Sequence, residues 1–172
     1  MTKKLIMLIV AIVAFGLFQT STRADEDSDT QIGVGAHYWI SLDDIDTDWD
    51  ENAISYYVSF RYNPSLWGIE ANVEYYPKET LFRKAAYEPQ AFFILGNTLY
   101  GGIGLGWLYS DGDWADDPTY ALKAGFNIKL FDAIGLDINA NYRFNSFDDF
   151  DEDGKKIDMN TITLGAAVRY CF

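Results

Sequence analysis

The side chains that could carry out chemistry are one histidine, one cysteine and a large number of carboxylates. His37 is the only histidine in the chain, and Ser41 lies four residues after it. Acid–base catalysis needs partner groups within hydrogen-bonding reach of the imidazole, and no His-x-Ser pair occurs here. We therefore interpret His37 as a polar residue of the interior, and we assign no catalytic residue.

Acidic residues gather in three short segments. The three sets are Asp43, Asp44, Asp46, Asp48, Asp50 and Glu51; Asp111, Asp113, Asp116 and Asp117; and Asp148, Asp149, Asp151, Glu152 and Asp153. Segments of this kind favour a solvated surface on which like charges repel each other. The functional alternative is capture of divalent cations or of cationic partners.

The last of these segments contains DFDEDG, in which Asp149, Asp151 and Asp153 alternate before Gly154. This spacing resembles the first half of a calcium-binding loop. The second half does not fit, because Asn160 stands where such a loop needs a glutamate. The alternate glycines Gly102, Gly104 and Gly106 lead into no helix, so they predict no nucleotide site. We assign no metal-binding residue, no cofactor-binding residue and no cofactor.

Composition narrows the class of protein. The chain has 172 residues, a formal net charge of −13 and 17% aromatic residues. The negative charge argues against nucleic acid as a partner. The single cysteine, Cys171, excludes an intrachain disulfide.

The first 24 residues have the pattern of an export signal. Lys3 and Lys4 precede an apolar run from Leu5 to Phe18, and Ala24 follows a short polar stretch. Residues 1–24 are therefore predicted to be a cleaved signal peptide, and residues 25–172 one folded domain. The run is shorter than the roughly 20 residues of a spanning helix, so an uncleaved anchor is the weaker alternative.

Apolar and polar residues alternate through eight segments, which predicts strands. The segments are Gln31–Leu42, Ala53–Tyr62, Trp67–Tyr76, Gln90–Gly96, Leu99–Tyr109, Thr119–Leu130, Ile134–Phe147 and Thr161–Phe172. The segment Gln90–Gly96 is apolar on both faces, which leaves its facing open. Alternation alone fits a water-soluble barrel as well as a membrane barrel.

The connectors and the aromatic residues favour a membrane barrel. Long and short connectors alternate along the chain, as in an up-and-down meander with long outer loops and tight inner turns. Threaded this way, Tyr and Trp fall near the two ends of the strands, and aliphatic residues fill the middle of one face. Tyr and Trp favour the headgroup level of a bilayer, so this sorting predicts two membrane interfaces.

With the signal peptide, the eight segments and the ending Ala166, Val168, Tyr170 and Phe172, the chain resembles small bacterial outer-membrane β-barrels of the OmpA/OmpX type. The resemblance implies an all-β fold, an eight-stranded antiparallel up-and-down transmembrane β-barrel, in the outer membrane of a Gram-negative-type bacterium. It implies contact with outer-membrane lipid, and recognition by the outer-membrane assembly machinery through a last strand ending in Phe172. A monomer is expected.

An eight-stranded barrel leaves a lumen just wide enough to be filled by side chains. The residues expected inside it are Arg61, Lys123, Arg143, Arg169, Glu70, Glu74 and Asp137.

We expect a non-enzymatic protein that contributes to envelope integrity, adhesion or surface interaction. Three alternatives stay open: an enzyme acting on outer-leaflet lipid through His37, a narrow pore, and a secreted soluble barrel that binds a hydrophobic ligand inside.

Overall fold

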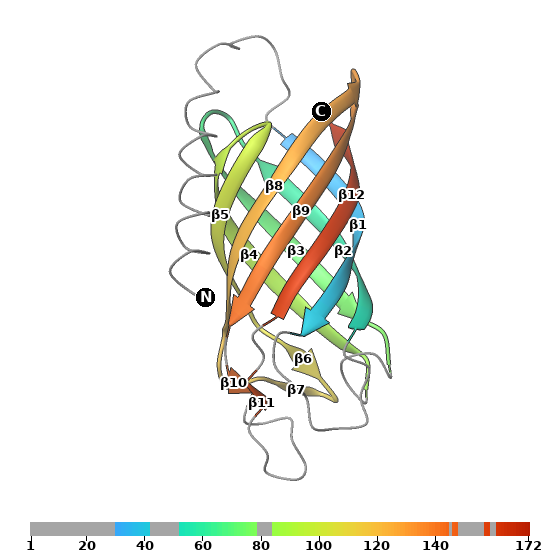
Figure 1. Cartoon of the computed structure of the whole chain (residues 1–172), viewed down its shortest axis with the longest axis vertical. Coiled ribbons are helices and arrows are strands. Elements are labelled where there is room, and N and C mark those ends of the chain that lie inside the picture. Colours follow the sequence, from blue (N-terminus) through green and yellow to red (C-terminus); the bar gives the residue numbers. More distant parts are fainter. Residues whose placement is uncertain (1–29, 42–51, 79–83, 145, 148–156, 159–160) are drawn as a thin grey trace.

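The computed structural model describes residues 30–41, 52–78, 84–144, 146–147, 157–158 and 161–172. Eight long strands dominate this part of the chain (Figure 1). They are β1 Thr30–Ser41, β2 Asn52–Tyr62, β3 Trp67–Tyr76, β4 Ala86–Gly96, β5 Leu99–Gly106, β8 Thr119–Phe131, β9 Ile134–Phe144 and β12 Thr161–Cys171. Four two-residue strands complete the set: β6 Tyr109–Ser110, β7 Asp113–Trp114, β10 Ser146–Phe147 and β11 Ile157–Asp158.

The eight long strands form a closed antiparallel meander. Each pairs with its neighbour along the chain, and β12 pairs with β1 from Gln31↔Cys171 to Ser41↔Thr161. The ring therefore has no free edge, and the predicted eight-stranded up-and-down barrel is confirmed. We call its two ends the short-turn end, where β2–β3, β4–β5 and β8–β9 are connected, and the long-loop end.

Strand β4 begins four residues earlier than the sequence analysis predicted. The predicted segment starts at Gln90, directly after Pro89, yet Pro89 lies within β4 opposite Val73. A proline cannot donate to a β-ladder and is tolerated at irregular positions. The pairing of β4 is irregular at this point, because the ladder with β5 ends at Gln90↔Gly106 and resumes with β6 at Tyr87↔Tyr109.

The third long connector carries a hairpin that the sequence analysis did not predict. Strands β6 and β7 pair as Tyr109↔Trp114 and Ser110↔Asp113. Between them, Asp111 and Gly112 both have positive φ, 56° and 98°, as a two-residue type I′ hairpin requires. Because β6 also pairs with β4, this hairpin continues the barrel wall beyond β5.

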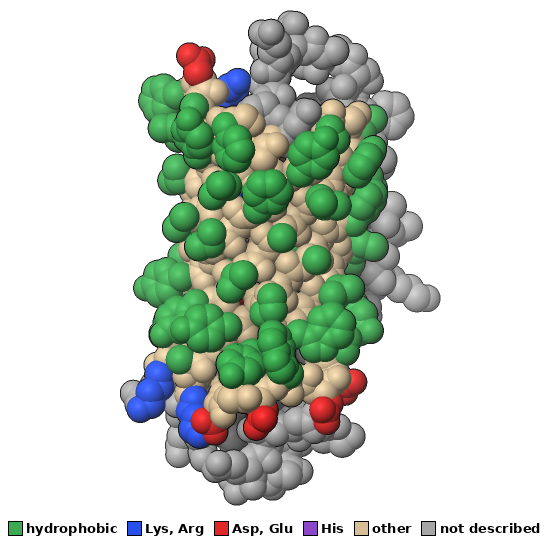
Figure 2. Space-filling view, turned by 180° about the vertical axis from the view of Figure 1, so that it is seen from behind, with side chains coloured by type: hydrophobic (Ala, Val, Ile, Leu, Met, Phe, Trp, Pro, Cys, Tyr) green, Lys and Arg blue, Asp and Glu red, His purple; other side chains and the backbone are tan. Residues whose placement is uncertain are grey.

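Apolar side chains point outward and polar side chains point inward. Outward-facing Val34, Ile103 and Val168 are 63%, 62% and 60% exposed, whereas Arg143 and Arg169 are 3% and 0% exposed. Hydrophobic side chains cover the outer face in Figure 2, and charged ones appear only towards its two ends. The secreted soluble barrel, which needs the opposite arrangement, is therefore wrong.

The aromatic residues at the two ends of the outer face lie next to one another. Tyr75 and Tyr87 are in contact at the long-loop end, with ring centroids 5.1 Å apart. Trp67 and Phe93 lie at the short-turn end, with ring centroids 6.4 Å apart. These pairs agree with the two predicted aromatic belts.

One side of the lumen is apolar, which the sequence analysis did not predict. Phe92, Ile94, Tyr100 and Ala121 form a buried cluster on β4, β5 and β8. The facing of β4 is thereby settled: Phe92 and Ile94 point inward. Gly104 makes room for this cluster, because a Cβ at its position would lie 2.3 Å from Cδ1 of Phe92.

Within the described ranges, no helix is long and apolar enough to cross a membrane.

Replacing Ile138 by arginine tests which medium the outer face contacts. Ile138 lies mid-strand in β9 and is 51% exposed. If it faces hydrocarbon, Ile138→Arg should lower the free energy of unfolding by about 2–4 kcal/mol. Urea unfolding in lipid vesicles measures this, with Ile138→Leu as the control. A change of less than about 0.5 kcal/mol, as at an ordinary water-exposed position, would contradict a lipid-facing surface.

Candidate functional site

The lumen holds a network of buried charged side chains that come from most of the long strands. All seven residues predicted to lie inside are buried. Among the described residues, the buried cations are Arg61, Lys123, Arg143 and Arg169, and the buried carboxylates are Glu70, Glu74, Glu88 and Asp137. Four cations match four carboxylates, so these eight residues add nothing to the formal net charge of −13.

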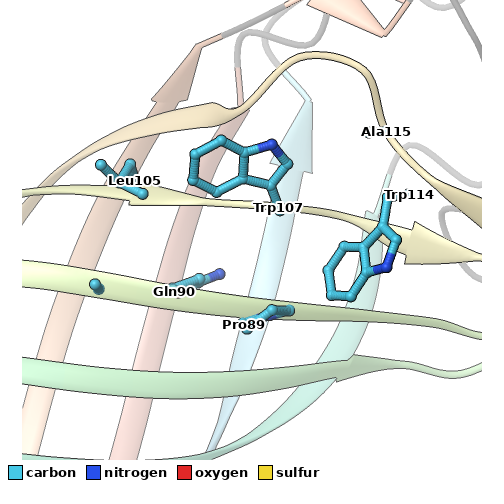
Figure 3. Close-up of a pocket in the computed structure, with 7 residues that line it drawn as sticks. Pro89, Gln90, Leu105, Trp107, Trp114 and Ala115 are labelled. Atoms are coloured by element: carbon cyan, nitrogen blue, oxygen red, sulfur yellow. The ribbon is translucent and has the colours of Figure 1, made fainter.

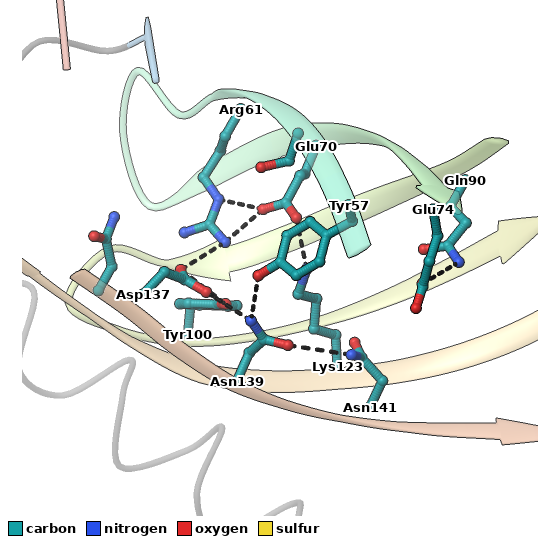
Figure 4. Close-up of polar contacts among 12 residues, drawn as sticks. Tyr57, Arg61, Glu70, Glu74, Gln90, Tyr100, Lys123, Asp137, Asn139 and Asn141 are labelled. Atoms are coloured by element: carbon teal, nitrogen blue, oxygen red, sulfur yellow. Dashed lines mark hydrogen bonds and ion pairs between the residues drawn. The ribbon is translucent and has the colours of Figure 1, made fainter. Parts of the chain in front are cut away.

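Glu70 is the centre of the first half of this network (Figure 4). Its Oε2 accepts from Nε of Arg61 at 2.5 Å and from Nη2 of Arg169 at 3.1 Å, and its Oε1 accepts from Nζ of Lys123 at 2.5 Å. Arg61 lies opposite Glu70 on the neighbouring strand β2, whereas Lys123 on β8 and Arg169 on β12 reach it from strands that do not pair with β3.

Asp137 on β9 completes this group, which we call the Glu70 cluster. Its Oδ2 lies 3.2 Å from Nη2 of Arg61 and 3.1 Å from Nε of Arg169. Tyr100 donates its hydroxyl to Oδ1 of Asp137 at 2.9 Å, and the Arg61 guanidinium lies 4.1 Å from the Tyr100 ring centroid. Three cations therefore share two carboxylates, and an aromatic face covers one of the cations.

Glu74 is the centre of the second half, the Glu74 cluster, nearer the long-loop end. Arg143 pairs with Glu74 through Nη2, and with Glu88 through Nη1 at 2.6 Å. Tyr76 donates to Glu88 at 2.5 Å. Gln90 donates to Glu74 at 3.1 Å and to Glu88 at 2.9 Å. Glu88 precedes the predicted segment Gln90–Gly96, yet it is part of β4 and 2% exposed.

Asn139 links the two clusters. Its Nδ2 donates to Asp137 at 2.8 Å and to the Tyr57 hydroxyl at 3.1 Å, while its Oδ1 lies 3.1 Å from Nε2 of His37. Because His37 also contacts Glu74, the polar network continues from the Glu70 cluster to the Glu74 cluster. Figure 4 shows Asn139 between Asp137 and Asn141. Side chains fill the lumen of the described barrel, as expected for eight strands.

The surroundings of His37 do not form a nucleophile–base pair. Its Nδ1 lies 2.9 Å from Oε1 of Glu74. Ser55 donates its hydroxyl to this same carboxylate and accepts from Nε1 of Trp39 at 2.7 Å. The serine is therefore bonded to the acid and not to the imidazole, and both Ser55 and His37 are at most 1% exposed. The side chain of Ser41 lies outside the described residues.

Only one of the three acidic segments lies in the described part of the chain. Asp111, Asp113, Asp116 and Asp117 are exposed at the long-loop end. Asp111 pairs with Lys84. The described residues contain no group of three or more His, Cys, Asp or Glu that could hold a metal ion. The segments 43–51 and 148–153, the latter with its calcium-like spacing, lie outside the described residues, as does the predicted signal peptide 1–24.

An apolar outer band, a closed ring of strands and a charge-balanced lumen define a transmembrane β-barrel. Hydrocarbon offers no hydrogen-bonding partner, so the strands must pair every backbone group among themselves, as a closed ring does. The particular architecture is that of the small eight-stranded outer-membrane barrels.

Solved structures show this likeness directly. Neisserial surface protein A (NspA) matches with a TM-score of 0.60 and 14% identity, over 86% of this chain and 100% of that one. The N-terminal β-barrel domain of Pseudomonas aeruginosa OprF matches with a TM-score of 0.51 and 11% identity, over 86% and 100%. No family model and no curated protein sequence matches the chain. At these identities, the likeness establishes the fold alone.

Removing the Glu70 carboxylate should destabilise the barrel more than removing a surface ion pair. Glu70→Ala leaves Arg61 and Arg169 buried with Asp137 as their carboxylate partner, and it removes the carboxylate that Lys123 contacts. Losing one member of a buried pair costs about 3–5 kcal/mol. Asp111→Ala, which breaks the exposed pair with Lys84, should cost at most about 1 kcal/mol. Urea unfolding in vesicles measures both values, and equal losses would mean that the Glu70 cluster is not a stabilising centre.

Proposed function

We propose that the protein is a non-enzymatic outer-membrane barrel that presents a negatively charged surface outside the cell, and so contributes to envelope integrity or to surface interaction. The long-loop end faces outward in this proposal. Residues 1–24 act as the signal peptide, and the chain is a monomer. The outer-membrane assembly machinery recognises the C-terminal end of the chain, where Val168 and Tyr170 on the outward face of β12 precede the exposed Phe172.

The observation that carries the proposal is the cross-linked lumen. The contacts of Glu70 with Arg61, Lys123 and Arg169 connect four strands through the centre of the barrel. A wall braced in this way favours a rigid anchor over a narrow pore, since conduction needs an open path lined by hydrated groups.

The distribution of charge supports a role for the outer surface. Because the described lumen residues balance, the excess negative charge belongs to the remainder of the chain. Exposed Asp113, Asp116 and Asp117 carry part of it at the long-loop end. Such a surface attracts divalent cations and cationic proteins or peptides over about one Debye length, about 8 Å at physiological ionic strength.

Binding of a cationic peptide to intact cells tests this proposal. The variant Asp113→Asn/Asp116→Asn/Asp117→Asn should bind less fluorescent polylysine than the unchanged protein, and the difference should disappear as salt screens the charges. Asp132→Asn, a single change at the exposed short-turn end, is the control and should have no effect. Cell fractionation and gel mobility before and after heating establish that each variant is folded in the outer membrane. Unchanged binding by the triple variant would contradict a charge-presenting surface.

The enzyme alternative has a separate test. An outer-leaflet lipid hydrolase or acyltransferase that used His37 would lose its activity in His37→Ala, assayed by mass spectrometry of outer-membrane lipids. We expect identical lipid profiles for the two proteins, because His37 is enclosed by Glu74, Asn139 and Tyr57. A modified lipid that disappears in this variant would overturn the non-enzymatic proposal.

A further inference from the structure

A groove lies on the outside of the barrel near the long-loop end (Figure 3). Its volume is about 550 Å³, and it is lined by Pro89, Gln90, Ala91, Leu105, Trp107, Trp114 and Ala115. These residues come from β4, β5, the segment after β5 and the β6–β7 hairpin. The volume falls within the range of about 300–1,000 Å³ that is usual for small-molecule sites.

The groove exists because small outward-facing side chains lie beside large ones. Ala91 on β4 pairs with Leu105 on β5, and the backbone N–H of Trp107 donates to the carbonyl of Pro89 at 3.1 Å. Large side chains thus stand beside a proline and an alanine on the neighbouring strand. The β6–β7 hairpin adds Trp114, whose ring lies 5.1 Å from that of Tyr109.

The chemistry of the groove suits an apolar ligand. None of its lining residues is charged, and Gln90 is the single one with a polar side chain other than the indoles. The Gln90 amide is 7% exposed and donates into the lumen, to Glu74 and Glu88. The neighbouring exposed residues Asp113 and Asp116 are acids, so they offer a phosphate headgroup no cationic partner. Recognition must therefore act on an apolar chain.

We propose that this groove holds one acyl chain of a lipid from the outer leaflet, an assignment of leaflet that rests on the proposed outward orientation of the long-loop end. The groove is continuous with the lipid-facing band, because Leu105, Trp107 and Trp114 are 42%, 40% and 56% exposed on the same outer surface. Tryptophan at the end of a membrane strand marks the level where headgroups meet chains. A lipid of that leaflet would reach the groove with its chain directed towards the middle of the bilayer.

Shape must decide this binding. An acyl chain is shielded from water in the bilayer as well as in the groove. The hydrophobic effect therefore does not favour the groove, and association depends on packing contacts. Filling the groove should therefore weaken retention even though the new side chain is itself apolar. Changing the lipid headgroup should matter little.

Native mass spectrometry of the full chain in lipid nanodiscs tests the proposal. The nanodiscs contain equal amounts of phosphatidylcholine and phosphatidylglycerol with the same chains, and collisional activation removes loosely held lipid stepwise. The unchanged protein should retain one lipid, of either headgroup. In Ala91→Phe, the fraction that retains a lipid should fall about tenfold, equivalent to about 1.4 kcal/mol.

Two further variants keep the test decisive. Ala166→Phe is the matched control: Ala166 faces outward on β12, four strands away from β4 around the ring, and this variant should retain the lipid. Trp107→Leu keeps an apolar side chain but removes a wall of the groove, so it should weaken retention. Gel mobility before and after heating shows that each variant is folded.

Three outcomes would overturn the inference. Equal retention by Ala91→Phe and Ala166→Phe would mean that the lipid is held elsewhere. Retention of phosphatidylglycerol alone would mean that a headgroup site is responsible. Dimers in the unchanged protein that Ala91→Phe abolishes would mean that a second copy of the chain covers the groove.

Discussion

The closure of β12 onto β1 is the constraint on which the rest of the structure depends. In hydrocarbon, an unpaired backbone N–H or C=O costs several kcal/mol, so the sheet is stable there only as a ring. Eleven residue pairs join the two strands, from Gln31↔Cys171 to Ser41↔Thr161. Once the ring is closed, each strand has one face towards lipid and one towards the lumen, and the alternation of its side chains determines which residues occupy each.

The closed ring forces charged side chains into a small dry space. Isolated ions there would be strongly unfavourable, and even paired ions regain their desolvation cost only with good geometry and additional hydrogen bonds. The Glu70 and Glu74 clusters provide both, through shared carboxylates, tyrosine hydroxyls and the Asn139 bridge. Phe92 and Tyr100 contribute further, since their rings face Lys123 at 4.8 Å and Arg61 at 4.1 Å.

Local periodicity was sufficient to predict the eight strands, the facing of all of them except β4, and the seven charged residues of the lumen. It was not sufficient at Pro89, which reads as the end of a loop although Glu88 and Gln90 continue the alternation on the lumen side. The Asp111–Gly112 pair carried a hairpin signal that the sequence analysis did not use.

Periodicity could not predict the side-chain contacts between strands. The bond between Ser55 and Glu74 depends on how β2 and β3 are aligned. The facing of Phe92 depends on the glycines of β5 opposite it. Both follow from register, which no single segment of the sequence contains.

The partners of Glu70 lie 9, 53 and 99 residues away along the chain. The most distant partner, Arg169, lies on the final strand β12. The interior therefore cannot lose all its water while the earlier hairpins form. Water must hydrate these ions until β12 pairs with β1 and β9, and it must leave as Arg169 forms its ion pairs. The charges of the Glu70 cluster are therefore fully paired only when β12 is in place, in keeping with the slow folding of proteins dominated by long-range contacts.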